Sequence, residues 1–132
     1  MRIGLAPLAF ALALVSFGPA AAQESADPEK LSLEQNMLLR CSAAFALVAA
    51  RQEQGDEAFA HYPAMDVRGK EYFVQAGARL MDELGWSEEI LAARMQGAVV
   101  QLVEAADASG DRMRHLDDVM GPCLLSLDAS GI

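Results

Sequence analysis

The chain has 132 residues, with 10 Lys and Arg against 19 Asp and Glu, which gives a formal net charge of −9 at pH 7. An acidic surface repels nucleic-acid phosphates and anionic lipid head groups, so we expect no nucleic-acid partner. A neutral or cationic partner is easier to accommodate. The acidity is equally explained by the need to keep an exported protein soluble, and we prefer this simpler explanation.

The first 22 residues have the layout of a secretory signal peptide. Arg2 is followed by an apolar stretch up to about Phe17 and by three alanines, so we expect cleavage before Gln23. The apolar stretch is shorter than the roughly 20 residues of a membrane-spanning helix. We therefore predict a periplasmic or secreted protein with no membrane span in the mature chain. Residues 23–31 would form a flexible lead-in, and residues 32–132 one helical domain.

The first of four predicted helices runs from about residue 33 to residue 54. Ser32 and Gln35 have the spacing of a capping box, and Gly55 can end a helix in the left-handed conformation. Apolar residues recur along it at spacings of three and four, as on one face of a helix. This stripe consists of Leu33, Met37, Cys41, Phe45 and Val48.

The second and third helices are predicted on either side of Gly85. The second begins between residues 66 and 69 and ends at Leu84. The third occupies residues 88–108, because Ser87 can cap it and Trp86 can pack on Leu91 as a hydrophobic staple. We therefore interpret this lone tryptophan as structural.

The fourth helix is predicted to begin after Asp111. Its apolar residues follow a heptad seam, and they are Met113, Leu116, Met120, Cys123 and Leu127. Gly121 and Pro122 interrupt the seam, so we expect a kink or a restart there. Four amphipathic helices with short turns predict an all-α fold, an antiparallel four-helix bundle. The alternative is a three-helix bundle with a broken last helix.

The two cysteines, Cys41 and Cys123, are predicted to form a disulfide. Cysteines of an exported chain usually pair, and in an up–down bundle the first and fourth helices are antiparallel neighbours. The two cysteines then lie at heights that agree to within about one or two turns. Lipidation of Cys41 is disfavoured because Arg40 replaces the small residue of a lipobox. The spacing also excludes a C-x-x-C redox pair and a C-x-x-C-H haem attachment site.

Three segments of the chain, "RCSAAF", "RGKEYFVQAGARLMDELG" and "VMGPCLLSLDASG", carry a resemblance to known sequences. Together they resemble small exported bacterial helical proteins that have two cysteines and no assigned activity. The resemblance covers most of the mature chain. It implies an exported location and a paired set of cysteines, and it transfers no catalytic residues.

The sequence gives little support for metal or haem binding. His115 lies near Asp111 and Asp118 on one helix face, but a solvated face of this kind is far commoner than a metal site. Most methionines fall on the apolar stripes, where they fill the core. We therefore predict no metal and no cofactor, and we keep a haem or metal carrier as the alternative function.

The connection before the second helix is the candidate binding loop. It combines aromatic and basic residues, namely His61, Tyr62, Arg68, Lys70 and Tyr72, with Asp66 among them. Exposed loops often carry function, but the favoured interpretation is that Tyr62 and Pro63 cover the end of the bundle.

No catalytic motif supports an enzyme. The chain has no G-x-S-x-G elbow and no phosphate-binding loop, and its paired acids are adjacent in sequence, so they point apart on a helix. The sequence therefore predicts a non-enzymatic helical module that binds a protein or a small ligand. An enzyme that uses residues 61–72 ranks last.

Overall fold

The structure is a computed structural model that describes residues 30–132. Within that range it contains four long helices, one short 3-10 helix and no strand, so the predicted all-α four-helix bundle is confirmed. The predicted signal peptide and nearly all of the lead-in lie outside the described residues. The elements are α1 (Leu33–Glu53), η1 (Glu57–Phe59), α2 (Arg68–Leu84), α3 (Glu88–Ala108) and α4 (Arg112–Ala129).

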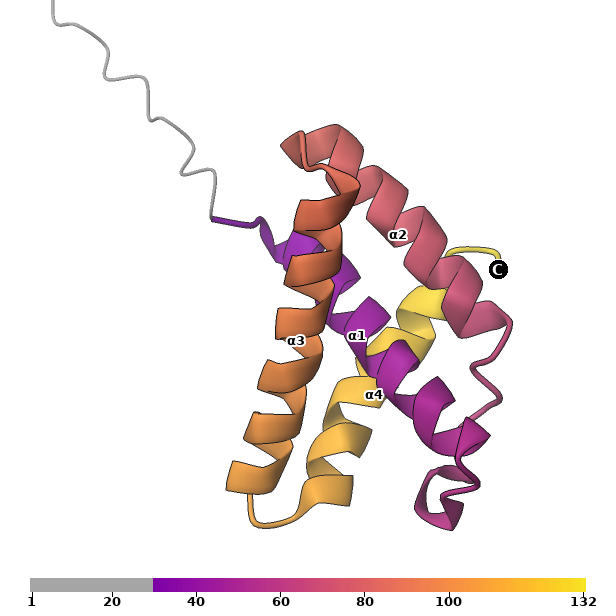
Figure 1. The fold of residues 1–132 in the computed structure, drawn as a ribbon. Helices are drawn as coiled ribbons and strands as arrows, with labels where there is room; N and C mark the ends of the chain where they lie inside the picture. Colours follow the sequence, from indigo (N-terminus) through magenta and orange to yellow (C-terminus); the bar gives the residue numbers. More distant parts are fainter. Residues whose placement is uncertain (1–29) are drawn as a thin grey trace, which may run out of the picture.

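Helix α1 is the central element. Figure 1 shows α2 and α3 meeting at their shared turn and diverging, while α1 crosses between them and α4 leads from the end of α3 back towards α2. Helix α1 contacts all three other helices, including α3, which would lie diagonally opposite in a simple up–down bundle. The five consecutive residues 41–45 are all buried. Because successive side chains are about 100° apart, α1 is enclosed on every side at this level.

The predicted helix ends are present. Ser32 and Gln35 form a reciprocal capping box, and the Ser87 hydroxyl accepts a hydrogen bond from the Ile90 amide at 3.2 Å. Gly85, directly after α2, has a φ of 66°, which is the left-handed conformation that glycine adopts without strain. Helix α1 ends at Glu53, one residue earlier than predicted.

The sequence predicted a kink or a restart at Gly121 and Pro122, and of these two the restart is not observed, because α4 continues through Pro122. Proline has no amide hydrogen, and the carbonyl of Asp118 therefore loses its usual partner four residues on. Both Asp118 and Pro122 are exposed, so water can bond to that carbonyl. The lost bond therefore lies at the surface, and the alternative of a broken last helix is not observed.

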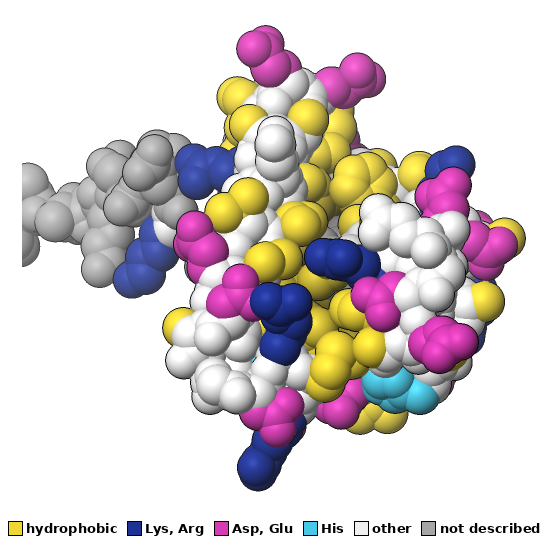
Figure 2. All heavy atoms as spheres, turned by 60° about the horizontal axis from the view of Figure 1, so that its bottom comes forward, with side chains coloured by type: hydrophobic (Ala, Val, Ile, Leu, Met, Phe, Trp, Pro, Cys, Tyr) yellow, Lys and Arg dark blue, Asp and Glu magenta, His cyan; other side chains and the backbone are white. Residues whose placement is uncertain are grey.

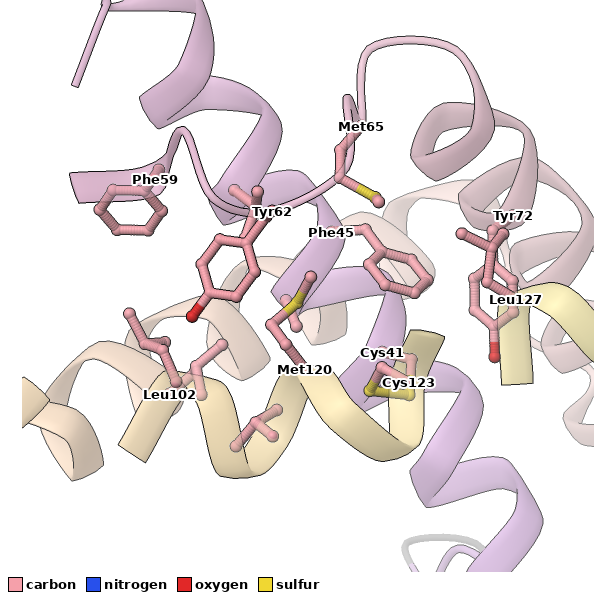
Figure 3. Packing of buried hydrophobic residues seen from close by; sticks show 14 of the residues in the cluster. Cys41, Phe45, Phe59, Tyr62, Met65, Tyr72, Leu102, Met120, Cys123 and Leu127 are labelled. Carbon is pink, nitrogen blue, oxygen red and sulfur yellow. A yellow bond between two sulfur atoms is a disulfide. The ribbon is translucent and has the colours of Figure 1, made fainter. Parts of the chain in front are cut away.

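The disulfide between Cys41 and Cys123 lies in the middle of the main core. The two Cα atoms are 5.1 Å apart, and both residues are essentially inaccessible to solvent. Figure 3 shows the bond between α1 and α4, with Phe45 and Met120 packed beside it. It links residues that are 82 positions apart. The predicted pairing is thereby confirmed.

A second, smaller cluster closes the other end of the bundle around Leu80, Trp86 and Met95. Leu91 packs against this cluster, as the predicted staple requires. A Cβ atom at Gly77 would lie 2.9 Å from Cδ2 of Leu91, so the glycine permits a close approach of α2 and α3.

Removal of either cysteine is expected to destabilise the fold equally. In Cys41→Ser and in Cys123→Ser the same bond is lost, which in the chain-entropy model lowers the free energy of unfolding by about 4 kcal/mol. Urea unfolding of the two variants and of the double variant measures this. A single variant whose stability matches that of the oxidised wild type would contradict it.

Removal of the Ser42 hydroxyl is expected to stabilise the protein. Ser42 is fully buried and its hydroxyl has no hydrogen-bond partner within residues 30–132, so it is desolvated without compensation. Ser42→Ala should raise the free energy of unfolding by about 1 kcal/mol. Ser126→Ala is the matched control, because the Ser126 hydroxyl is bonded to the Tyr72 hydroxyl at 3.0 Å and its loss should destabilise.

Candidate binding groove

The segment between α1 and α2 folds back along the last turns of α1. Figure 3 shows Phe59, Tyr62 and Met65 pointing from this segment into the core, and all three are buried. Burial of Tyr62 agrees with the favoured interpretation that it covers the bundle, whereas Pro63 is exposed. The predicted binding loop is therefore a packed wall rather than a free loop.

Gln52, in the last turn of α1, anchors this wall. Its side-chain amide nitrogen lies 3.1 to 3.2 Å from three backbone carbonyl oxygens, those of Phe59, Tyr62 and Pro63, so one of its two hydrogens is shared between two of these acceptors. Its oxygen accepts from the Met65 amide at 3.1 Å. One side chain thus bonds to four backbone groups of the segment and replaces the secondary structure that the segment lacks.

Asp117 of α4 holds the same wall from the other side. Its Oδ1 accepts a hydrogen bond from the Tyr62 hydroxyl at 2.6 Å and lies 3.0 Å from Nε2 of His61. The other ring nitrogen of His61 lies 2.9 Å from the Ala58 carbonyl oxygen. The His61 ring thus lies between the Ala58 carbonyl and Asp117.

This cluster shifts the acid–base behaviour of two of its members. Burial, together with the hydrogen bond to Asp117, raises the pKa of Tyr62 well above that of a free tyrosine. The hydrogen bond from Tyr62, followed by the bond from His61, lowers the pKa of Asp117 below its ordinary range. Near neutral pH, Tyr62 is therefore a neutral donor and Asp117 a charged acceptor.

An open groove of about 990 Å³ lies between this wall, the last turns of α1 and the first turns of α2. Its floor includes Phe45, Met65 and Phe73. Small side chains line much of it, and these are Ala46, Ala49, Ala50, Ala60 and Ala64. The lining of the groove is thus more apolar than polar.

Three charged residues line the groove, Glu53, Asp66 and Lys70. All three are exposed, and the ion pairs within residues 30–132 include none of them. By contrast, two other lining residues already have partners for their polar atoms: the Gln52 amide is bonded to the wall, and the Tyr62 hydroxyl is bonded to Asp117 of α4. The side-chain polar groups left for a ligand therefore belong to these three exposed charged residues, which we call the rim of the groove.

The residues of the predicted binding loop do not converge on one site. Tyr62 and Lys70 line the groove, whereas His61 faces Asp117. Tyr72 packs edge-on against the Phe45 ring, with ring centres 5.1 Å apart, inside the core. Arg68 forms an ion pair with Asp128 of α4 at 2.9 Å. Tyr72 and Arg68 thus join α2 to α4.

Sequence reasoning missed Gln52, Asp117 and the alanine face of α1. Ala46, Ala49 and Ala50 precede Glu53 by seven, four and three residues, which places all four side chains on one helix face. That spacing is visible in the sequence and could have revealed the face. No local pattern distinguishes Gln52 or Asp117 from other polar residues near a helix end.

A second hollow lies at the end of the molecule where α1 and α3 finish and α4 begins. Figure 2 views this end and shows hydrophobic side chains in a furrow with charged side chains along its edges. The hollow has a volume of only about 50 Å³, and Arg51, Phe59, Val103 and Arg112 are among its lining residues. Arg112 is already paired with Asp107. The hollow is too small for more than a few atoms of a ligand.

The described residues hold no group of three or more His, Cys, Asp and Glu side chains that could bind a metal ion. His115 and its two neighbouring aspartates thus do not form the site considered from the sequence. In the same part of the chain, no helix combines the length and the apolar character that crossing a membrane requires.

Comparison with known proteins does not identify a family. No protein-family model matches the chain, and no curated protein or solved structure matches it either. The resemblance to small exported two-cysteine proteins therefore stays a prediction.

Loss of the Gln52 side chain is expected to loosen the wall of the groove. Gln52→Ala leaves three carbonyls and one amide of residues 59–65 without their partner. It should lower the free energy of unfolding by about 2 kcal/mol and speed amide hydrogen exchange at Met65. Gln54→Ala, an exposed position two residues on, is the control. Equal exchange rates in both variants would refute the anchoring role.

The contribution of Asp117 to the free energy of unfolding is expected to disappear at acidic pH. A carboxyl group whose pKa is lowered by folding stabilises the protein above its unfolded value of about 3.9, and this stabilisation is lost as the pH falls through the folded value. At pH 6 Asp117→Asn should be less stable than wild type by under about 1 kcal/mol, since the side chain is half exposed.

Between about pH 4 and pH 2 the wild type and Asp117→Asn should converge in stability. Urea unfolding at a series of pH values tests this, with Asp118→Asn as the matched control on the same helix. If the difference in the free energy of unfolding between wild type and Asp117→Asn persists unchanged at pH 2, the charged carboxylate of Asp117 is not the source of the stabilisation.

Proposed function

We propose that the chain is a non-enzymatic helical binding module that works in the periplasm or outside the cell. The observation that carries this proposal is the groove of about 990 Å³ beside α1. Its size lies at the upper end of the range of known ligand sites. Its lining combines apolar side chains with the exposed charged groups of Glu53, Asp66 and Lys70, a combination that protein-binding surfaces also have.

The rigidity of the groove supports binding. Gln52 of α1 and Asp117 of α4 hold the wall from two helices, and the Cys41–Cys123 bond joins those helices. A preformed surface loses less conformational entropy when a ligand binds than a loop that must first become ordered. The groove therefore needs no folding step before it can accept a ligand.

The chemistry of the lining supports binding over catalysis. The Tyr62 hydroxyl is bonded to Asp117, and Gln52 is bonded to the wall, so neither is free to act on a substrate. The remaining ionisable groups, Glu53, Asp66 and Lys70, are exposed and form no hydrogen bond with one another. A nucleophile activated by a neighbouring base is therefore not found among the residues of the groove.

The disulfide and the sequence of the leader support an exported location. Disulfides form and persist in oxidising compartments such as the periplasm and the cell exterior. The pattern of residues 1–22, which includes a charged start and small residues before Gln23, is that of a secretory signal peptide.

Site-specific photocrosslinking in cells tests the proposed function. A photoreactive amino acid at Ala50, in the groove, is compared with the same amino acid at Ala78, an exposed position of α2 outside the groove. We expect an adduct of defined mass at position 50 and none at position 78. No adduct at position 50, or the same adducts at both positions, would refute the proposal.

Spectroscopy of the purified protein tests the alternative of a carrier. A Soret absorbance band or a stoichiometric metal content would contradict the proposed binding module and favour a haem or metal carrier.

A further inference from the structure

We propose that the occupant of the groove is a polypeptide segment that combines apolar side chains with a lysine or arginine. This proposal rests on the proposed function and adds the class of partner. It follows from where the free polar groups of the groove lie, from their charge and from the size of the lining side chains.

The distribution of polar groups favours a polypeptide over a small molecule. A small-molecule site fixes its ligand with polar groups that converge inside an apolar pocket. Here the inner polar groups, Gln52 and the Tyr62 hydroxyl, are already bonded to the wall and to Asp117. The side-chain polar groups of the lining that have no partner among the described residues are those of the exposed Glu53, Asp66 and Lys70, and apolar side chains bordered by exposed charged groups are the arrangement of a protein–protein interface.

The size of the lining side chains also favours a polypeptide. Ala46, Ala49 and Ala50 present methyl groups along one face of α1, and two of the three are exposed. Short side chains let a second backbone approach a helix closely and pack apolar side chains against it. A bound peptide segment can therefore lie along the groove in contact with α1.

The charge of the rim favours a basic partner. Among the lining residues, Glu53 and Asp66 supply two carboxylates and Lys70 supplies one ammonium group, and no ion pair within residues 30–132 includes any of them. The nearby cation Arg68 is neutralised by Asp128. The chain as a whole carries a net charge of −9, which attracts basic segments over longer distances. The same charge opposes docking of a second copy of this acidic chain.

The test uses a fluorescein-labelled amphipathic peptide of leucine, alanine and lysine, about four helical turns long. A second peptide carries glutamate at each lysine position. Fluorescence anisotropy measures binding of both peptides to the disulfide-bonded protein. We expect the lysine peptide to bind at least about tenfold more tightly than the glutamate peptide. Equal binding of the two peptides, or no binding of the lysine peptide, would overturn the proposal.

Two pairs of variants locate the binding site. Ala50→Trp fills the groove, and Ala78→Trp places the same bulk on an exposed position of α2 outside it. We expect Ala50→Trp to weaken binding of the lysine peptide by about tenfold or more and Ala78→Trp to leave it unchanged. Circular dichroism and thermal unfolding verify that each variant is folded, and equal effects of the two would overturn the proposal.

The second pair separates the rim from the general acidity of the chain. The double variant Glu53→Gln, Asp66→Asn removes two rim charges, and Glu71→Gln, Asp82→Asn removes two exposed charges that do not line the groove. Both raise the net charge by the same amount. We expect the rim variant to weaken binding about threefold more than its control. An equal loss of affinity in the two double variants would mean that the peptide is held only by the general negative charge of the chain, and the proposal would be wrong.

Two further outcomes distinguish this proposal from the proposed function. If the adduct at position 50 is a small molecule, the binding module stands and the polypeptide partner is wrong. If analytical ultracentrifugation shows a dimer that Ala50→Trp abolishes, the occupant is a second copy of the chain, which also overturns the basic partner.

Discussion

The bond between Cys41 and Cys123 fixes α4 against α1, and the remaining contacts of α4 depend on that placement. Asp117 lies six residues before Cys123, about 9 Å along the helix, where it meets Tyr62. Ser126 lies three residues after Cys123, where it meets Tyr72 of α2. The disulfide thus sets the register of a helix that holds the groove wall on one side and α2 on the other.

The groove is accordingly a product of three constraints that come from different parts of the chain. Gln52 supplies hydrogen bonds to an irregular segment, Asp117 supplies a charged acceptor, and the alanines of α1 leave the space empty. An irregular segment is stable in this position only because its backbone groups have partners. Gln52 and Asp117 together hold the wall at the edge of the groove from two different helices.

The sequence predicted the helices well because their signals are local. The capping residues and glycines that mark a helix end lie within about four residues of that end. The disulfide could be predicted because both cysteines lie on apolar stripes of their helices. Of the predicted kink or restart at Pro122, the restart does not occur, because the carbonyl that loses its partner lies at an exposed position, and the sequence does not reveal that exposure. The roles of Gln52 and Asp117 could not be predicted, since both depend on contacts between residues distant along the chain or outside regular structure. Tyr62 and Tyr72 were plausible binding residues whose burial only tertiary packing decides.

The enclosure of α1 divides that helix into two sets of positions with different freedom to change. Residues 41–45 are surrounded, so a larger side chain there must displace a neighbouring helix. Ala46 and Ala50 are exposed in the groove, so a larger side chain there reshapes the groove and leaves the core intact. Selection can therefore alter what the groove accepts through the second set while the first set preserves the fold. Specificity and stability are separable within a single helix.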